Sequence, residues 1–187
     1  MNAQPPRGRI VSLCVPAERQ AEEDIVRLVD DHRQLGRLCD MLECCADDLP
    51  RLPPRPVMEQ ICSALTQLCE EGEPVCAPYP EILELYAFED PLAAILMEQV
   101  HARRLADATH AQDLVDALRG DLDVAERLSS TTLGYMLRCF FEGCRQAMDC
   151  EELAILTLAR HRLSSVARYK LIDSLRMRAH GRRYSIA

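Results

Sequence analysis

The sequence predicts an all-α protein, and three observations support this prediction. Hydrophobic residues make up 48% of the chain and charged residues 28%, with only 7 Gly and no Trp. The long segments repeat apolar residues at steps of three and four, without the alternation that strands show. Prolines fall between these segments and end them. Four long helices with short connections favour an antiparallel up-down four-helix bundle, with an extra C-terminal helix.

We expect one domain for the bundle, residues 17–163, because 187 residues can bury a core without disulfides or a metal. Residues 1–16 contain Pro and Arg without periodicity and are expected to form an N-terminal arm. Residues 164–187 are expected to form a basic helix and tail packed on or beside the bundle.

The first helix is expected over residues 17–48, starting after Pro16. One face of this helix forms an apolar stripe, which consists of Ile25, Leu28, Leu35, Cys39 and Leu42. His32 lies in the middle of this stripe. Burying an imidazole without a partner is costly, so His32 needs a hydrogen bond or a metal. For a single His, a core residue satisfied by a neighbour is the ordinary interpretation. Other helices repeat the pattern, and this favours the metal.

A proline-rich connection separates this helix from a second one that begins near Val57. The predicted buried face of the second helix consists of Met58, Ile61, Cys62, Leu65, Leu68 and Cys69. Gly72 and the three prolines that follow predict a break, and then a short helical piece over residues 81–88.

The third helix is expected over residues 91–119. Asp90 is an N-cap candidate before a proline at the first helical position, and Gly120 ends the helix. The inward line of this helix is predicted as Ala94, Met97, His101, Leu105, Ala108 and Val115.

The fourth helix is expected from Ser129 or Ser130, which can cap it, to about residue 162, after a loop over residues 121–127. Its stripe is predicted as Leu133, Leu137, Phe140, Cys144, Ala147, Glu151 and Leu158. A last helix is expected from Ser164 to about residue 180. Its basic residues are interpreted as a solvated face that pairs with the protein's own acids.

Composition indicates a soluble, cytoplasmic protein. A net charge of −8 argues against nucleic acid and anionic membranes as partners, and no apolar run approaches the roughly 20 residues of a membrane span. The ten cysteines are expected to be reduced, because none shows C-x-x-C spacing and five lie on apolar stripes, namely Cys39, Cys62, Cys69, Cys139 and Cys144. Pairs such as Cys62 and Cys69 lie about 10 Å apart along one helix, too far for a disulfide.

Each of the four helices offers a metal-ligand residue on its inward side. These residues are His32, then Cys69 with Glu73, then His101, and finally Glu151. Two imidazoles and two carboxylates could bind iron, manganese or zinc, with a thiol nearby. We expect His32 and His101 to approach one another in the core. Each residue also has an ordinary explanation: for Glu73 that it faces water, and for Glu151 that it ends an acidic edge.

With these residues the chain resembles the bacterial hemerythrin-like, or HHE cation-binding, family from about Asp24 to Arg178. The stretches that carry the resemblance are LVDDHRQL, DPLAAILMEQVHARR, LGYMLRCFFEGCRQAMDCEELAILTLAR and RMRAHGRR. The family places one His on the first helix, His-x-x-x-Glu on the second, one or two His on the third, and His-x-x-x-Glu on the fourth. The resemblance implies a hemerythrin-like bundle that senses dioxygen, iron or redox state.

The departures from the family pattern concern its imidazoles. The second-helix pair reads Cys69-x-x-x-Glu73, and the fourth-helix pair reads Ala147-x-x-x-Glu151. One turn after His101 stands Leu105, so a second His is absent there as well. These substitutions imply a reduced or altered site with His32, Glu73, His101, Glu151 and, as a soft ligand, Cys69.

The leading hypothesis is therefore a hemerythrin-like sensor or regulatory protein, with iron, as a single ion or a di-iron pair, or zinc in the altered site. Its ligand would be the metal ion or a small diatomic molecule. The alternative is a metal-free helical interaction protein in which the same residues form a buried polar network, with a protein partner or a second copy of the chain. We expect no enzymatic activity, because Glu-x-x-His pairs on the inward stripes and a nucleophile with a positioned base are missing.

Overall fold

The computed structural model describes residues 15–71, 91–119, 128–158 and 163–184, apart from a few side chains within these ranges, that of His101 among them. All regular secondary structure in these ranges is helical, which confirms the all-α class. The helices are α1 (Val15–Asp48), α2 (Arg55–Glu71), α4 (Pro91–Arg119), α5 (Ser130–Leu158) and α6 (Ser165–Tyr184).

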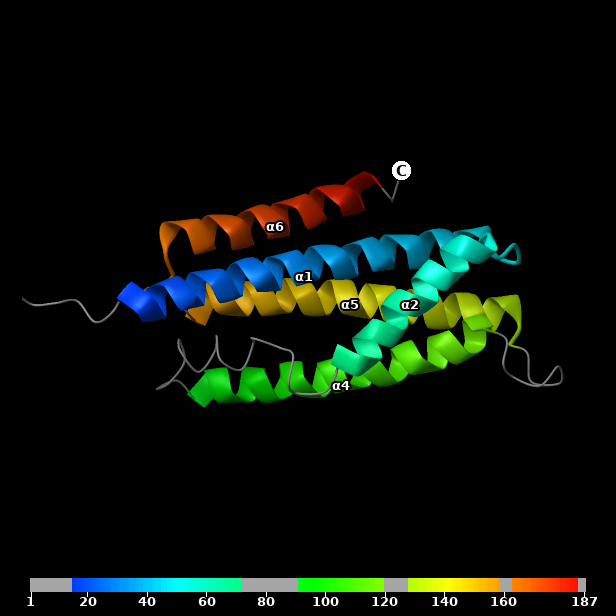
Figure 1. Ribbon diagram of the computed structural model, residues 1–187, viewed down its shortest axis with the longest axis horizontal. Coiled ribbons are helices and arrows are strands. Elements are labelled where there is room, and N and C mark those ends of the chain that lie inside the picture. The colour runs from blue at the N-terminus through cyan, green and yellow to red at the C-terminus, as the bar shows by residue number, and fades with distance from the viewer. Residues whose placement is uncertain (1–14, 72–90, 120–127, 159–162, 185–187) are drawn as a thin grey trace, which may run out of the picture.

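The helices form a bundle in which α1, α4, α5 and α6 run along the long axis (Figure 1). α5 lies between α1 and α4 and runs opposite to both. α6 packs against α1 and α5, on the side of the molecule away from α4, as expected for the extra C-terminal helix. α2 has 17 residues, crosses the long axis obliquely, and packs mainly on α4.

The helix boundaries follow from prolines and serine caps. α1 and α2 each begin two residues before the predicted positions and flank the connection around Pro50. Ser129 caps α5, where its Oγ accepts a hydrogen bond from the backbone N of Thr132 at 3.1 Å. Ser164 caps α6 in the same way, through the backbone N of Ala167 at 3.1 Å. α6 continues four residues beyond its predicted end, whereas residues 81–88, 121–127 and 159–162 lie outside the described part of the chain.

The buried apolar side chains form two clusters. The large apolar cluster joins the second half of α1 to α2, α4 and the first half of α5, and includes Cys39, Leu42, Ile61, Leu65, Leu114, Leu137, Phe140 and Cys144. The small apolar cluster joins the first half of α1 to the end of α5 and to α6, and consists of Ile25, Leu28, Val29, Ile155, Leu163, Ala167 and Leu171. Most of the predicted stripes of α1, α2 and α5 are therefore buried as expected.

The predicted inward line of α4 is wrong at Leu105, which is 58% exposed. Successive residues turn about 100° around a helix axis, so Leu105 points about 80° away from the buried Val115. Val115 of the predicted line is buried as expected, and in the described part of α4 it is joined by Ala111, Leu114 and Leu118. The side chains of Ala94 and Met97 lie outside the described part.

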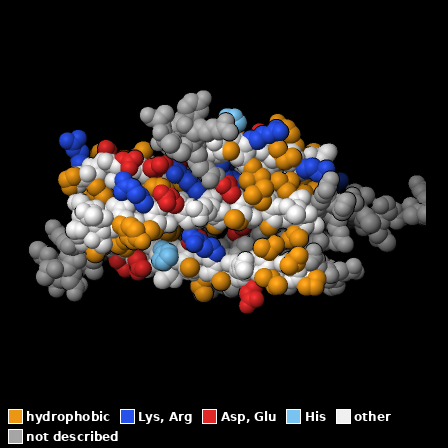
Figure 2. Space-filling model, turned by 180° about the vertical axis from the view of Figure 1, so that it is seen from behind, with side chains coloured by type: hydrophobic (Ala, Val, Ile, Leu, Met, Phe, Trp, Pro, Cys, Tyr) orange, Lys and Arg blue, Asp and Glu red, His pale blue; other side chains and the backbone are white. Residues whose placement is uncertain are grey.

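The surface mixes charges with apolar side chains, as Figure 2 shows for the face seen from behind. Arg178 pairs with Asp149 and Glu152 on α5, as predicted for the basic C-terminal helix, but its side chain is 15% exposed and does not belong to a solvated face. None of the described helices combines the length and the apolarity that crossing a membrane requires.

Candidate functional site

A buried polar network lies at the junction of α1, α5 and α6, the helices that also build the small apolar cluster. We define it by His32 on α1, by Asp149, Glu151 and Glu152 on α5, and by Ser174 and Arg178 on α6. Four of these residues are almost fully withdrawn from solvent: His32, Glu151, Glu152 and Ser174 are 5%, 4%, 0% and 4% exposed. Charged residues therefore face inward at this junction, and each of their buried polar atoms needs a hydrogen-bond partner.

His32 is held on both sides of its ring. Its Nδ1 lies 2.8 Å from Oε1 of Glu152, and its Nε2 lies 2.9 Å from Oε2 of Glu151. A neutral imidazole can donate through only one nitrogen, whereas the imidazolium donates through both. The geometry with a carboxylate at each nitrogen therefore favours the charged ring.

Glu152 is the most connected member of the network. Its Oε1 also accepts a hydrogen bond from the Ser174 hydroxyl at 2.9 Å, and its Oε2 lies 2.7 Å from Nη2 of Arg178. Arg178 also donates two hydrogen bonds. Its Nε donates to Oδ1 of Asp149 at 2.8 Å, and its Nη1 donates to the Ser174 hydroxyl at 2.9 Å. Glu152 thus ties α1 and α6 to α5 through a single carboxylate.

The charges of the network stabilise one another. Burial by itself would lower the pKa of His32, but the hydrogen bonds and charges of Glu151 and Glu152 outweigh it, and the pKa lies above its ordinary 6.5. Burial would likewise raise the pKa of Glu152, but His32 and Arg178 hold it below its ordinary 4.5. Both residues are therefore favoured in their charged forms.

A second polar group faces the network from α4. Nε of Arg103 lies 3.0 Å from Oδ1 of Asp107, and burial raises the pKa of Asp107 although Arg103 opposes the shift. The negative charge of Glu151 acts on Asp107 in the same direction as burial. Gly143 on α5 makes room for the Arg103 guanidinium, because a Cβ at this position would contact it.

The structure brings together two of the five predicted ligand residues, His32 and Glu151. The Cys69 thiol, with its single hydrogen, lies within hydrogen-bond distance of two backbone oxygens, that of Leu65 at 3.2 Å and that of Ala108 at 3.5 Å, and Cys69 packs against the large apolar cluster. Glu73 and the side chain of His101 lie outside the described part of the chain. The expected approach of His32 to His101 therefore stays a prediction.

Sequence reasoning missed Glu152, although its neighbour Glu151 was selected. The apolar stripe of α5 passes through Glu151, and residue 152 lies about 100° further round the helix. Glu152 is buried because α6 covers that side of α5. Two adjacent acids before an apolar run, together with the basic residues of α6, were the signal that could have found it.

The described side chains around His32 do not have the arrangement of a metal site. A ring nitrogen binds a metal through its lone pair, which the imidazolium lacks. Within the described ranges, no group of three or more His, Cys, Asp and Glu side chains converges as a metal site would require. Zinc needs about four ligands and iron sites commonly more, so the described donors alone do not fit such a site. The metal stays a prediction.

The buried cysteines, Cys39, Cys45, Cys62 and Cys144, show the features of core thiols, whereas Cys139, which was predicted to lie on an apolar stripe, is exposed, as are Cys44 and Cys150. The eight cysteines in the described ranges are free. Burial raises the pKa of Cys45 and Cys62, and a hydrogen bond with Cys39 together with burial raises the pKa of Cys144. A nucleophilic cysteine requires the opposite shift, toward the thiolate.

Comparison with protein-family models, curated proteins and solved structures finds no match for this chain.

Proposed function

We propose that this protein is a non-enzymatic, regulatory helical bundle of hemerythrin-like form, in which a buried polar network takes the place of the metal. The observation that carries the proposal is the double engagement of His32, whose two nitrogens lie 2.8 and 2.9 Å from carboxylates. The favoured imidazolium form has no lone pair for a metal. Its function is then to bind a partner, either another protein or a second copy of the chain.

Two further observations support a non-enzymatic role. His32 is 5% exposed and both of its nitrogens are occupied, so a general base that must reach a substrate is not formed there. The described thiols with shifted pKa values have them raised, which disfavours the thiolate.

Free thiols at the eight described cysteines also favour a reducing compartment such as the cytoplasm.

Metal analysis tests the proposal. Protein purified from cells supplemented with iron and zinc should retain less than about a tenth of an equivalent of metal, and a chelator should leave its thermal midpoint unchanged, because a metal that binds only the folded state would raise that midpoint. Retention of about one equivalent that disappears in Glu151→Gln, but not in the exposed control Glu142→Gln, would refute the metal-free assignment.

The second candidate is the metal-binding sensor with the altered ligand set His32, Cys69, Glu73, His101 and Glu151. One observation favours it. Metal-ligating histidines commonly donate their other ring N–H to a carboxylate, and the contact of Nδ1 of His32 with Glu152 has this arrangement. In this case Nε2 of His32 and Glu151 would hold iron or zinc. Metal content that falls in both Glu151→Gln and Cys69→Ser would support this candidate.

A further inference from the structure

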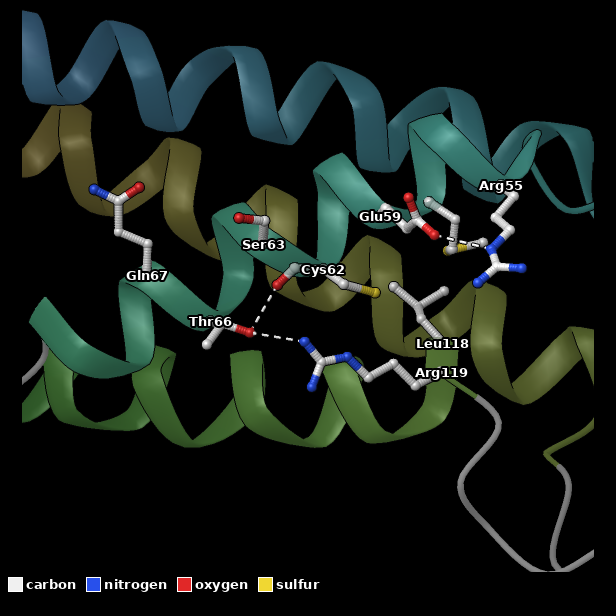
Figure 3. Close-up of a pocket in the computed structure, with 9 residues that line it drawn as sticks. Arg55, Glu59, Cys62, Ser63, Thr66, Gln67, Leu118 and Arg119 are labelled. Carbon is white, nitrogen blue, oxygen red and sulfur yellow. Dashed lines mark hydrogen bonds and ion pairs between the residues drawn. The ribbon is translucent and has the colours of Figure 1, made fainter.

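A groove of about 730 Å³ opens between α2 and α4, two helices that contribute no residue to the buried polar network, and its lining on α2 ends at Gln67, two residues before Cys69. Cys62 and Leu118 form its buried floor, being 4% and 7% exposed. Polar side chains from successive turns of α2 and from the end of α4 line the remainder (Figure 3). Pockets for small organic ligands have this volume and this combination of an apolar floor with a few polar groups.

The charge of the groove contrasts with that of the chain. The protein carries a net charge of −8, whereas the groove is lined by two arginines and one acid. Arg55 lies at the start of α2, where its Nε is 2.9 Å from Glu59. Arg119 reaches from the end of α4 back toward α2, as Figure 3 shows, and within the described residues it has no carboxylate at ion-pair distance. Among the residues that the structure describes, the groove therefore has one guanidinium without a carboxylate at ion-pair distance.

The donors around Arg119 suit an anion. Nη2 of Arg119 lies 3.5 Å from the Thr66 hydroxyl, which is long for a hydrogen bond, and the guanidinium also interacts with the Cys62 thiol. A guanidinium carries five N–H donors, so these two contacts leave donors for a ligand. The Thr66 hydroxyl is itself committed, since it donates to the Cys62 backbone oxygen at 2.8 Å. Ser63, one turn earlier on α2, adds an exposed hydroxyl to the lining. Guanidinium groups pair with carboxylate and phosphate oxygens through parallel hydrogen bonds.

The apolar part of the groove lies beside these donors. Met58 and Leu118 line the same groove as Arg119 and Ser63. A ligand with an anionic head at Arg119 could therefore bury an apolar body against these two side chains. Both features are needed for millimolar or tighter binding, because a single exposed ion pair contributes little.

We propose that this groove binds a small organic anion, with a carboxylate or a phosphate monoester held by Arg119 and an apolar body on Met58 and Leu118. The site is independent of the buried polar network, so it stands or falls separately from the proposed function. Occupation would stabilise the packing of α2 on α4 and could thus report the concentration of such a metabolite to a partner protein.

Nuclear magnetic resonance titration of the full chain tests this proposal, with phenyl phosphate, benzoate and the neutral benzyl alcohol as probes. We expect saturable amide shifts at residues 63, 66 and 119, with a Kd of about 1 mM or below for at least one anion. Comparison of phenyl phosphate with benzoate identifies the preferred head group. Shifts that do not saturate by about 10 mM, or equal binding of benzyl alcohol, would overturn the proposal.

Arg119→Gln should weaken binding of the better anion at least about tenfold, because the guanidinium is the main anion contact. Arg176→Gln on α6 is the matched control, since it removes the same charge from an exposed position on another helix. Unchanged binding in Arg119→Gln, or an equal loss in both variants, would contradict a site at Arg119. Circular dichroism of each variant establishes that the helices persist. Weakening by Ser63→Ala, which leaves every charge in place, would be independent support.

Discussion

Replacing Glu152 by Gln should destabilise this protein more than any other single change from acid to amide. Glu152 is fully buried, accepts hydrogen bonds from His32 and Ser174, and lies 2.7 Å from Arg178. Gln has nearly the same shape and keeps one acceptor oxygen, so the change removes the negative charge and leaves the packing in place. Two positive groups then remain in the interior with one carboxylate fewer.

Breaking a buried ion pair by removing one partner typically costs about 3 to 5 kcal/mol. We expect the lower end, about 3 kcal/mol, because Glu151 still faces His32 and Asp149 still faces Arg178. For a chain of this length, 1 kcal/mol corresponds to about 2 to 4 °C, so the thermal midpoint should fall by about 6 to 12 °C. Urea unfolding should show a lower midpoint at an unchanged slope.

The loss should depend on pH in a defined direction. The pKa of His32 is raised, so the contribution of His32 to stability is complete below pH 6.5 and is lost as pH rises through the folded-state pKa. The pKa of Glu152 is lowered, so its contribution is complete above 4.5 and is lost as pH falls through the folded-state pKa. The difference in unfolding free energy between wild type and Glu152→Gln should therefore be largest between pH 4.5 and pH 6.5.

Glu142→Gln is the matched control, because Glu142 lies exposed on the same helix and its replacement should change stability little. A double-mutant cycle with His32→Gln should give a coupling of about 1 to 3 kcal/mol between His32 and Glu152. A loss below about 1 kcal/mol in Glu152→Gln at every pH would refute the buried polar network.

Three further substitutions test other parts of the fold by urea unfolding. Gly36→Ala should stabilise the protein by about 0.5 to 1 kcal/mol, since α1 has open space for a Cβ there and Ala favours the helix; destabilisation would mean that this face of α1 is covered. Leu65→Ala should cost about 2 to 5 kcal/mol, because the side chain is 0% exposed in the large apolar cluster; a cost below 1 kcal/mol would contradict the packing of α2. Ser164→Ala should cost about 1 kcal/mol through loss of the α6 cap and of the 2.7 Å hydrogen bond to Glu22, and Ser165→Ala at the next, exposed position serves as its control.

Local sequence patterns were sufficient for the helices and for most of the core. Prolines and serine caps act on the nearest backbone groups, so helix starts were predicted to within two residues at α1 and α2. Apolar periodicity likewise identified His32 and Glu151 as inward-facing, because the face of a helix is set by its own register. The sequence by itself therefore determined the all-α class and the inward orientation of two members of the buried polar network, His32 and Glu151.

The tertiary structure decided which partners these residues meet. Leu105 has the right spacing for the core, yet it is exposed because the neighbours of α4 lie on another side. The sequence did not single out Glu152, yet α6 buries it and supplies Ser174 and Arg178 from a segment 22 to 26 residues later in the chain. The two carboxylates that hold His32 lie about 120 residues away from it. Periodicity shows which way a side chain faces along its own helix, whereas only packing determines which helix covers that face and which charges meet there.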